Sequence, residues 1–248
     1  MRPSPVSPHT IVTIPVYNEQ KYVAKVLEEV REFAEHILVI DDGSTDDTPM
    51  LLARQPVDVI RHAENRGYGR SIRDAFRYAQ CYKYDWLITM DCDEQHEPES
   101  LPDFYEAITR DDADIISGSR YLHDKRCGDP PPADRRAING LVTDMVNRCL
   151  GLSLTDSFCG YKAYRVSALT HMHIDETGYA VPLQAWVMAA AADLRITEVP
   201  INLIYNDPNR SFGGPLDDPD LRLKHYKQVF RAELAKHPDK FAPCTAAV

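Results

Sequence analysis

Two aspartates one residue apart directly follow the apolar run WLITM in this chain. Asp91 and Asp93 open the segment DCDEQHEPE at 91–99. Hard cations such as Mg²⁺ and Mn²⁺ bind a few carboxylates and complete their coordination shell with water and phosphate oxygens. Gln95 and His96 are close enough in sequence to support such a site. Acidic surface loops are common, so the pair by itself is only weak evidence for a cation site.

Polar residues follow four other apolar runs in the same way. The four segments are Pro15-Val16-Tyr17-Asn18-Glu19, Asp41-Asp42-Gly43-Ser44, Glu64-Asn65-Arg66-Gly67 and Gly118-Ser119-Arg120. A carboxylate at such a point can accept hydrogen bonds from a nucleobase or a ribose, and Tyr17 can lie flat against a base. Ser44 and its neighbours can also simply cap a helix. The repeated coincidence of polar residues with strand ends favours one shared site.

Two arginines are candidates for binding phosphate, because a guanidinium pairs with phosphate oxygens through two parallel hydrogen bonds. Arg120 closes a predicted strand, and Arg210 lies in a loop rich in Gly, Pro and Asn. The segment 65–69, NRGYG, lacks the lysine of a Walker loop and the glycine spacing of a Rossmann loop. Three histidines are expected to be surface or structural residues: His62, His96 and His225.

Strand and helix patterns alternate through the first half. Strands are predicted at 11–15, 37–41, 57–62, 86–91 and 114–120, with helical periodicity at 23–33, 72–79 and 101–108. This alternation predicts an α/β fold with a doubly wound, mostly parallel but mixed sheet and helices on both faces. Such sheets bind ligands at the carboxyl ends of their strands. The polar segments above are therefore expected to meet at one edge.

The second half is less regular. A helical stripe at 138–150 is followed by a strand at 160–165, a buried helix at 182–194 and a long strand at 196–205. The turn-rich segment 206–220 is a candidate lid, and a last helix is predicted at 221–237.

Composition limits the classes of function. The 248 residues carry a formal net charge of −10, which argues against a general nucleic-acid binder. Six cysteines without a CxxC spacing are expected to be reduced thiols. The N-terminal segment has no apolar stretch typical of a signal peptide, and no segment is long and apolar enough to span a bilayer. We expect a cytoplasmic protein that at most lies at the cytoplasmic face of a membrane.

Six motifs together resemble the inverting family 2 glycosyltransferases of GT-A fold. They are PVYNE at 15–19, IDDGSTDDT at 40–48, ENRGYGRSI at 64–72, DCDEQHEPE at 91–99, GSRY at 118–121 and DSFCGYKAYR at 156–165. DxDxQHxPE and GSRY are most similar to the branch that transfers mannose or glucose to polyprenyl (dolichyl) phosphate. The resemblance implies one domain at 10–237, with a nucleotide-sugar-binding half at 10–121 and an acceptor half with a lid at 122–237. Flexible segments are expected at 1–9 and 238–248.

The resemblance also implies roles for individual residues. Those expected at the nucleotide are Pro15, Tyr17, Glu19, Asp41, Asp42, Asn65 and Asp91. Mg²⁺ or Mn²⁺ would be held by Asp91, Asp93 and Gln95. Arg120, Arg135 and Asn139 would meet the acceptor, and Arg210 would clamp the donor diphosphate. The implied partners are a nucleotide-sugar such as GDP-mannose or UDP-glucose and a polyprenyl phosphate.

The nature of the acceptor is open at this point. A hydroxyl acceptor needs a general base, whereas a phosphate is already anionic. Asp156 and Glu176 are the evident base candidates, which mildly favours a phosphate acceptor. Asn139 replaces the serine of the Arg-x-x-x-Ser pattern of the lipid-phosphate enzymes, which weakens the acceptor assignment. A soluble sugar, glycan or small molecule is the alternative acceptor, with Asp156 as the base.

Two other classes of protein remain as alternatives. A protein that senses nucleotide-sugar without catalysis is disfavoured by the acid pair and by the two arginines, Arg120 and Arg210. A sugar-1-phosphate nucleotidyltransferase would need a Gly-rich loop with Arg or Lys after the first strand, and PVYNEQKY is not such a loop.

Overall fold

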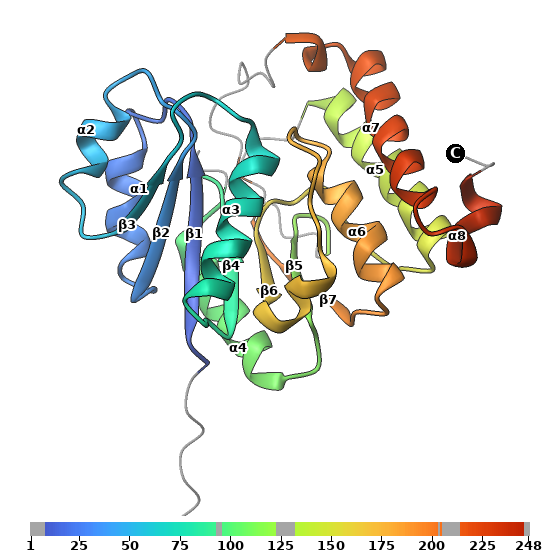
Figure 1. Cartoon of the computed structure of the whole chain (residues 1–248), viewed down its shortest axis with the longest axis horizontal. Coiled ribbons are helices and arrows are strands. Elements are labelled where there is room, and N and C mark those ends of the chain that lie inside the picture. The colour runs from blue at the N-terminus through green and yellow to red at the C-terminus, as the bar shows by residue number, and fades with distance from the viewer. Residues whose placement is uncertain (1–7, 93–95, 123–131, 203, 205–213, 246–248) are drawn as a thin grey trace, which may run out of the picture.

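The computed structural model describes residues 8–92, 96–122, 132–202, 204 and 214–245. Across these residues one sheet of seven strands runs through the molecule in the order β3-β2-β1-β4-β6-β5-β7. Helices lie on both of its faces (Figure 1). The predicted fold class is thereby confirmed.

Four strands form the parallel part of the sheet: β1 (Thr10–Val16), β2 (His36–Asp41), β3 (Asp58–Arg61) and β4 (Trp86–Thr89). Strand β6 (Lys162–Arg165) runs antiparallel between β4 and β5 (Ile115–Ser119). Strand β7 (Ile196–Pro200) is parallel to β5. The carboxyl ends of β1, β2, β4 and β5 therefore share one edge with the beginning of β6.

The helices divide between two cores. One core holds residues of α1 (Val23–Val30), α2 (Thr48–Leu52) and α4 (Leu101–Arg110), the last preceded by the short helix η1 (Pro98–Ser100). The other core holds residues of α3 (Tyr68–Cys81), η2 (Val166–His171), α5 (Ala133–Leu150), α6 (Val181–Ala191), α7 (Pro219–Leu234) and α8 (Pro238–Thr245). A further short helix, η3 (Gly214–Asp217), precedes α7.

Alternation along the strands produces these two cores. Ile11 in β1 packs in the core with α3, whereas its neighbour Val12 packs in the core with α1. In β2, Leu38 and Val39 divide in the same way. Both neighbours are apolar because helices cover both faces of the sheet, so the strands read as continuous apolar runs.

Several boundaries differ from the sequence prediction, among them three in the second half of the chain. The helix expected at 138–150 begins at Ala133, and the long strand expected at 196–205 ends at Pro200. Residues 238–245 form α8 instead of belonging to a flexible tail, because Phe241 is buried in the same core as α5 and α7. The tail prediction was therefore wrong for this stretch.

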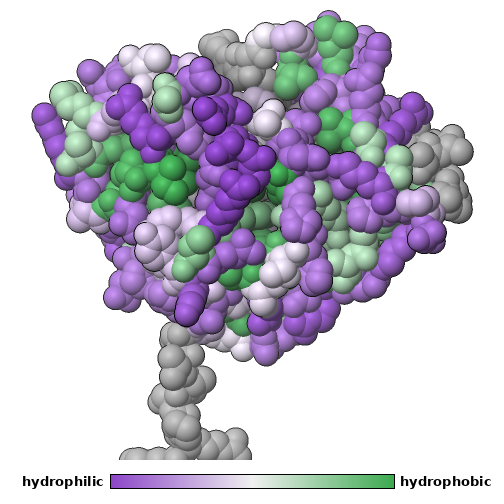
Figure 2. All heavy atoms as spheres, viewed as in Figure 1, coloured by the Kyte–Doolittle hydropathy of each residue, from purple (hydrophilic) through white to green (hydrophobic). Residues whose placement is uncertain are grey.

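The surface is mostly hydrophilic on the face drawn in Figure 2. Its largest hydrophobic patch lies over β1–β3, and polar side chains surround it. Among the described residues, every helix is too short or too polar to cross a bilayer.

Candidate functional site

The loops after β1 and β2 are tied together by Asn18. Its Oδ1 accepts hydrogen bonds from the backbone N–H groups of Thr45 (2.8 Å) and Asp46 (3.3 Å). Its own backbone N–H donates to Ser44 Oγ at 2.9 Å. Asn18 adopts a left-handed conformation with φ 57°, which asparagine tolerates better than most residues. No role was predicted for Asn18, although it lies within the PVYNE motif.

Asp41 ends β2 as a fully buried carboxylate. Its Oδ1 accepts a hydrogen bond from the backbone N–H of Ser44 at 2.8 Å. Its Oδ2 lies 3.2 Å from Nε of Arg61 but accepts no hydrogen bond from the described residues. Arg61 is half exposed and covers this oxygen. One buried acceptor therefore remains for a ligand that displaces the Arg61 side chain.

Asp42 holds the loop after β3. Its Oδ1 accepts from the backbone N–H of Arg66 (2.9 Å), and its Oδ2 accepts from that of Gly67 (2.8 Å). Nδ1 of the buried His62 is 2.6 Å from Oδ1, and Nε2 of the same ring is 3.1 Å from Asp74 Oδ2. Both carboxylate oxygens of Asp42 are thus engaged within the protein. His62 is a structural residue, one of the two roles expected for it.

Asp91 lies just beyond β4 with its carboxylate about one-third exposed, at 34%. Its backbone N–H donates to Nδ1 of the buried His96 at 2.9 Å, so His96 fixes the backbone at this point. A Cβ on Gly160 would lie 2.7 Å from Asp91 Oδ2, closer than such contacts allow. Only glycine at 160 leaves the carboxylate its present position.

The chemistry of Asp91 fits a hard cation. A partly exposed carboxylate at a strand end supplies the oxygen ligands that Mg²⁺ and Mn²⁺ prefer. The other two expected ligands, Asp93 and Gln95, lie outside the described residues. Within the residues described, no three His, Cys, Asp or Glu side chains gather as a metal cluster.

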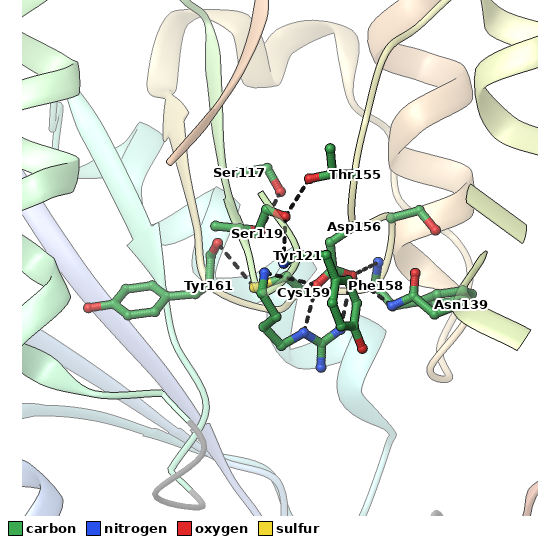
Figure 3. A network of polar contacts seen from close by, with 12 residues as sticks. Ser117, Ser119, Tyr121, Asn139, Thr155, Asp156, Phe158, Cys159 and Tyr161 are labelled. Atoms are coloured by element: carbon green, nitrogen blue, oxygen red, sulfur yellow. Dashed lines mark hydrogen bonds and ion pairs between the residues drawn. The ribbon is translucent and has the colours of Figure 1, made fainter. Parts of the chain in front are cut away.

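A buried ion pair joins β5 to the segment before β6. Arg120 donates to Asp156 through Nε (2.6 Å) and Nη2 (2.9 Å), and Asp156 is fully buried. Oδ1 of Asp156 also accepts from Asn139 Nδ2 (2.8 Å) and from the backbone N–H of Phe158 (3.2 Å). Figure 3 shows Asp156, Phe158 and Asn139 close together in this network. Oδ1 of Asn139 in turn accepts from the Thr143 hydroxyl at 2.9 Å.

These contacts decide what Asp156 can do chemically. Burial works to raise the pKa of the Asp156 carboxyl, but the charge and hydrogen bonds of Arg120, with the bond from Asn139, hold that pKa well below its ordinary value. A carboxylate with such a low pKa and so many donors is a poor proton acceptor. The geometry argues against the role of base that the soluble-acceptor alternative gives to Asp156. It also occupies both polar atoms of Asn139, which was expected at the acceptor.

Glu198 of β7 supports the same segment from the other side. Its carboxylate accepts from the backbone N–H groups of Thr155 (2.9 Å to Oε2) and Asp156 (3.2 Å to Oε1). The Thr155 hydroxyl shares a hydrogen bond with the Ser119 hydroxyl, and Ser119 Oγ accepts from the backbone N–H of Tyr121 at 3.1 Å (Figure 3). The ends of β5 and β7 and the 155–158 segment are thereby fixed relative to one another.

Lys162 is a buried cation that the sequence analysis missed. Its Nζ donates to the carbonyl of Cys159 and lies 5.1 Å from the centre of the Trp186 ring. Burial lowers the pKa of Lys162, and the charge of Asp156 works against that effect. The one feature of the sequence that could have pointed to it is a lysine at the start of the short strand KAYR.

Two arginines lie close to the Tyr121 ring. The guanidinium carbon of Arg136 is 3.7 Å from the centre of the Tyr121 ring, and that of Arg120 is 5.6 Å from it. Arg136 is exposed, whereas its neighbour Arg135, the residue expected at the acceptor, is half-buried in the first turn of α5. The guanidinium groups of Arg136 and Arg120 thus both lie close to the Tyr121 ring.

The remaining predicted site residues are distributed as follows. Tyr17 and Asn65 are exposed just beyond β1 and β3, while Pro15 and Glu19 are half-buried. Arg210 lies outside the described residues. The loops after β1, β2 and β3 contact one another. Asn18 joins the first loop to the second. Gly43 in the second loop lies against the backbone of Glu64 and Asn65 in the third.

Sequence comparison finds a family match over much of the chain. Residues 11–172 match Glycosyl transferase family 2. An undecaprenyl-phosphate mannosyltransferase of Micrococcus luteus is 31% identical over 211 residues, covering 81% of this chain and 86% of that protein. A polyprenol monophosphomannose synthase of Mycolicibacterium smegmatis is 30% identical over 213 residues, covering 80% of this chain and 79% of that protein.

Comparison with solved structures supports the expected type of fold. Glucosyl-3-phosphoglycerate synthase from Mycobacterium tuberculosis, in complex with Mn²⁺, UDP and glucosyl-3-phosphoglycerate, superposes with a TM-score of 0.70 at 17% identity. The match covers 91% of this chain and 80% of that chain. The likeness confirms the GT-A architecture.

Proposed function

This chain belongs to glycosyl transferase family 2, and from that premise we propose that it transfers a hexose from a nucleotide-sugar to a polyprenyl phosphate. The proposed reaction uses a divalent cation and inverts the anomeric centre. Its support comes from relatives that cover most of the chain and whose names include undecaprenyl phosphate or polyprenol monophosphomannose.

The engagement of Asp156 is the observation that carries the proposal. A soluble hydroxyl acceptor would require a base, and Asp156 was the leading candidate. Its carboxylate is instead buried and neutralised by Arg120. A phosphate oxygen needs no base, because it is already anionic and can attack the anomeric carbon directly. The bond from that carbon to the diphosphate oxygen breaks, and the nucleoside diphosphate leaves with the electron pair.

Arg120 would then serve the acceptor through the part of its guanidinium that Asp156 leaves free. Its side chain is 17% exposed, and Asp156 holds it rigidly through two hydrogen bonds. Arg136 stacks on Tyr121 beside it, and Arg135 precedes Arg136 on α5. A phosphate bound here would meet cationic side chains that are already oriented, which lowers the entropic cost of binding.

The donor would bind at the neighbouring loops. Tyr17 is exposed at the end of β1, where its ring can stack on a base. The Oδ2 atom of Asp41 is the buried acceptor that an imide or amino N–H of the base would satisfy once Arg61 moves aside. Arg210, which lies outside the described residues, is proposed to contact the diphosphate.

A divalent cation would be held by Asp91, together with Asp93 and Gln95 from outside the described residues. When bound, Mg²⁺ or Mn²⁺ would supply positive charge that stabilises the departing diphosphate. Asp91 contributes a fixed carboxylate, because His96 holds its backbone and Gly160 leaves space beside its oxygens. We also propose that the protein meets its lipid acceptor as a peripheral protein at a membrane surface.

A transfer assay with matched acceptors tests the proposal. GDP-mannose, UDP-glucose and UDP-N-acetylglucosamine are each incubated with Mn²⁺ and either a short polyprenyl phosphate, the corresponding polyprenol, or phosphoglyceric acid. We expect sugar transfer with one donor and only with the polyprenyl phosphate. NMR of the product should show an anomeric configuration opposite to that of the donor. Transfer to phosphoglyceric acid but not to the lipid would replace this acceptor with a soluble one.

A further inference from the structure

Tyr68 is the first residue of α3, and its hydroxyl lies beside the Asp91 carboxylate. A Cβ on Gly160 would lie 3.1 Å from the Tyr68 hydroxyl oxygen and 2.7 and 3.1 Å from Asp91 Oδ2 and Oδ1. The hydroxyl and both carboxylate oxygens therefore surround the same small space, which the missing side chain of Gly160 leaves open. The Tyr68 ring packs against the core that contains α3 and α6.

The backbone on both sides of Tyr68 is fixed. The N–H of Gly67 donates to Asp42 Oδ2, and the N–H of Gly69 donates to the carbonyl of Thr177, each at 2.8 Å. Gly67 has φ 91°, a conformation that glycine adopts far more readily than other residues. A side chain on Gly69 would overlap the carbonyl of Glu176, so the 176–177 backbone lies directly against this turn.

The Tyr68 ring is also held from the side of α6. The Tyr179 ring stacks on it with centroids 6.0 Å apart and planes 19° apart. The loop that carries Tyr179 is anchored by the buried Gln184, whose Oε1 accepts from the backbone N–H groups of Asp175 (3.0 Å) and Glu176 (2.9 Å). Tyr68 thus has little freedom to leave Asp91.

We propose that Tyr68 is a positioning residue that fixes the Asp91 carboxylate in the orientation that binds the divalent cation. A hydroxyl that donates to one part of a carboxylate directs its remaining lone pairs toward the cation and restricts rotation of the group. The inference rests on the proposed function, because it assumes that Asp91 is a cation ligand.

The chemistry of the two groups suits a donor and an acceptor. The Tyr68 hydroxyl can donate a hydrogen bond, and the Asp91 carboxylate beside it can accept one. A phenylalanine would preserve the ring and its stacking while removing only this donor.

The variant Tyr68→Phe tests the proposal, and Tyr78→Phe is its matched control. Tyr78 is on the same helix and donates to Asp58 Oδ2 at 2.7 Å, outside the site. Mn²⁺ binding to the protein in the presence of GDP or UDP is measured from the free-Mn²⁺ signal in electron paramagnetic resonance. We expect Tyr68→Phe to weaken Mn²⁺ binding about tenfold, within the range seen when a residue that orients a metal ligand is removed. Tyr78→Phe should bind Mn²⁺ like the unmodified protein.

A second readout separates positioning from a general loss of structure. In the transfer assay, Tyr68→Phe should need about ten times more Mn²⁺ for half-maximal rate, yet approach the normal rate when Mn²⁺ saturates. Its thermal unfolding midpoint should match that of Tyr78→Phe. Normal Mn²⁺ affinity in Tyr68→Phe would overturn the proposal. A loss of affinity together with an unfolding midpoint well below that of Tyr78→Phe would also overturn it.

The variant Asp91→Asn separates failure of this inference from failure of the proposed function. If the unmodified protein binds Mn²⁺ and Asp91→Asn does not, then a normal Tyr68→Phe result removes only the role of Tyr68. If Asp91→Asn binds Mn²⁺ as tightly as the unmodified protein, then Asp91 is not the ligand. This inference would then lose its basis, whereas the proposed function would stand with its cation held elsewhere.

Discussion

At the scale of single residues, the Asp156–Arg120 pair shows how burial changes the meaning of a carboxylate. Asp156 accepts five hydrogen bonds without any exposure to water. Replacing one partner of such a pair leaves the other charge buried without compensation, which costs about 3–5 kcal/mol. We therefore expect Asp156→Asn to lower the free energy of unfolding by about 3 kcal/mol. Urea unfolding followed by circular dichroism measures this change.

The control for Asp156→Asn is Asp193→Asn. Asp193 forms an ion pair with Lys240 at 2.6 Å, but its side chain is 84% exposed. Solvent screens such pairs, so this variant should unfold at nearly the same urea concentration as the unmodified protein. A stability of Asp156→Asn equal to that of Asp193→Asn would contradict this assignment.

Some site residues could be predicted from the sequence because local patterns place them. Asp41 and Asp91 each follow an apolar run, and the structure brings both to the edge of the sheet where strands end. Tyr68 and Lys162 could not be found in this way. Tyr68 meets Asp91 only because two distant loops and Gly160 converge, and no local pattern encodes that meeting.

At the scale of elements, Asp114 connects the start of β5 with the residues before β7. It accepts from Arg195 through Nε (3.0 Å) and Nη2 (2.9 Å), and from Arg165 Nε (3.1 Å). The hydrogen bond from the Arg195 side chain, with further contributions from its backbone and charge, lowers the pKa of Asp114 to about 2. In the unfolded chain the pKa of an aspartate is about 4.

This difference fixes the sign of a pH dependence. Because the folded pKa is the lower one, the pair stabilises the protein fully above about pH 5 and loses its effect as the pH falls from about 4 towards 2. Because solvent screens the pair, its contribution to the free energy of unfolding is about 1 kcal/mol. We expect Asp114→Asn to be less stable than the unmodified protein by that amount at pH 7, with a smaller difference at pH 3. A stability difference that stays constant between these pH values would contradict the assignment. The control is Asp112→Asn, because Asp112 belongs to an exposed ion pair with Arg110.

Helix α8 gives a second prediction at this scale. Phe241 is buried with 7% exposure in the core shared by α5 and α7. Phe241→Ala removes this contact and should lower the free energy of unfolding by about 3 kcal/mol, the lower end for a buried phenylalanine. Differential scanning calorimetry measures the change. Leu221→Ala is the control, because Leu221 is half exposed on α7. Equal stability of both variants would show that α8 contributes nothing.

The sequence predicted the individual strands better than their order. Five predicted strands of the first half appear within two residues at most ends, because a buried strand is a short apolar run bounded by turn residues. The placement of β6 between β4 and β5 depends on a long-range antiparallel pairing, such as that of Trp86 with Arg165. Hydrophobic periodicity carries no information about which strands pair, so this part of the topology could only be observed.

At the scale of the whole molecule, the site is assembled from segments that are far apart in the sequence. Tyr17 and Asp41 come from the first strands, Asp91 from the fourth, and Arg120 from the fifth. A ligand that contacts several of these segments at once must bind the folded protein and not the unfolded chain. Its binding free energy is therefore added to the stability of the whole fold.

Because of this linkage, thermal unfolding can identify the nucleotide that the donor carries. At a concentration of one hundred times its dissociation constant, a ligand stabilises the fold by about 2.7 kcal/mol. For a chain of this size that corresponds to a rise in the unfolding temperature of about 5–10 °C. In the presence of Mn²⁺, we expect one of the two nucleotides, GDP or UDP, to cause this rise and the other to cause none. Asp91→Asn should lose most of the rise, because the cation links the protein to the diphosphate. An equal rise for that variant would mean that the nucleotide binds without Asp91, and the cation would then have to be held elsewhere.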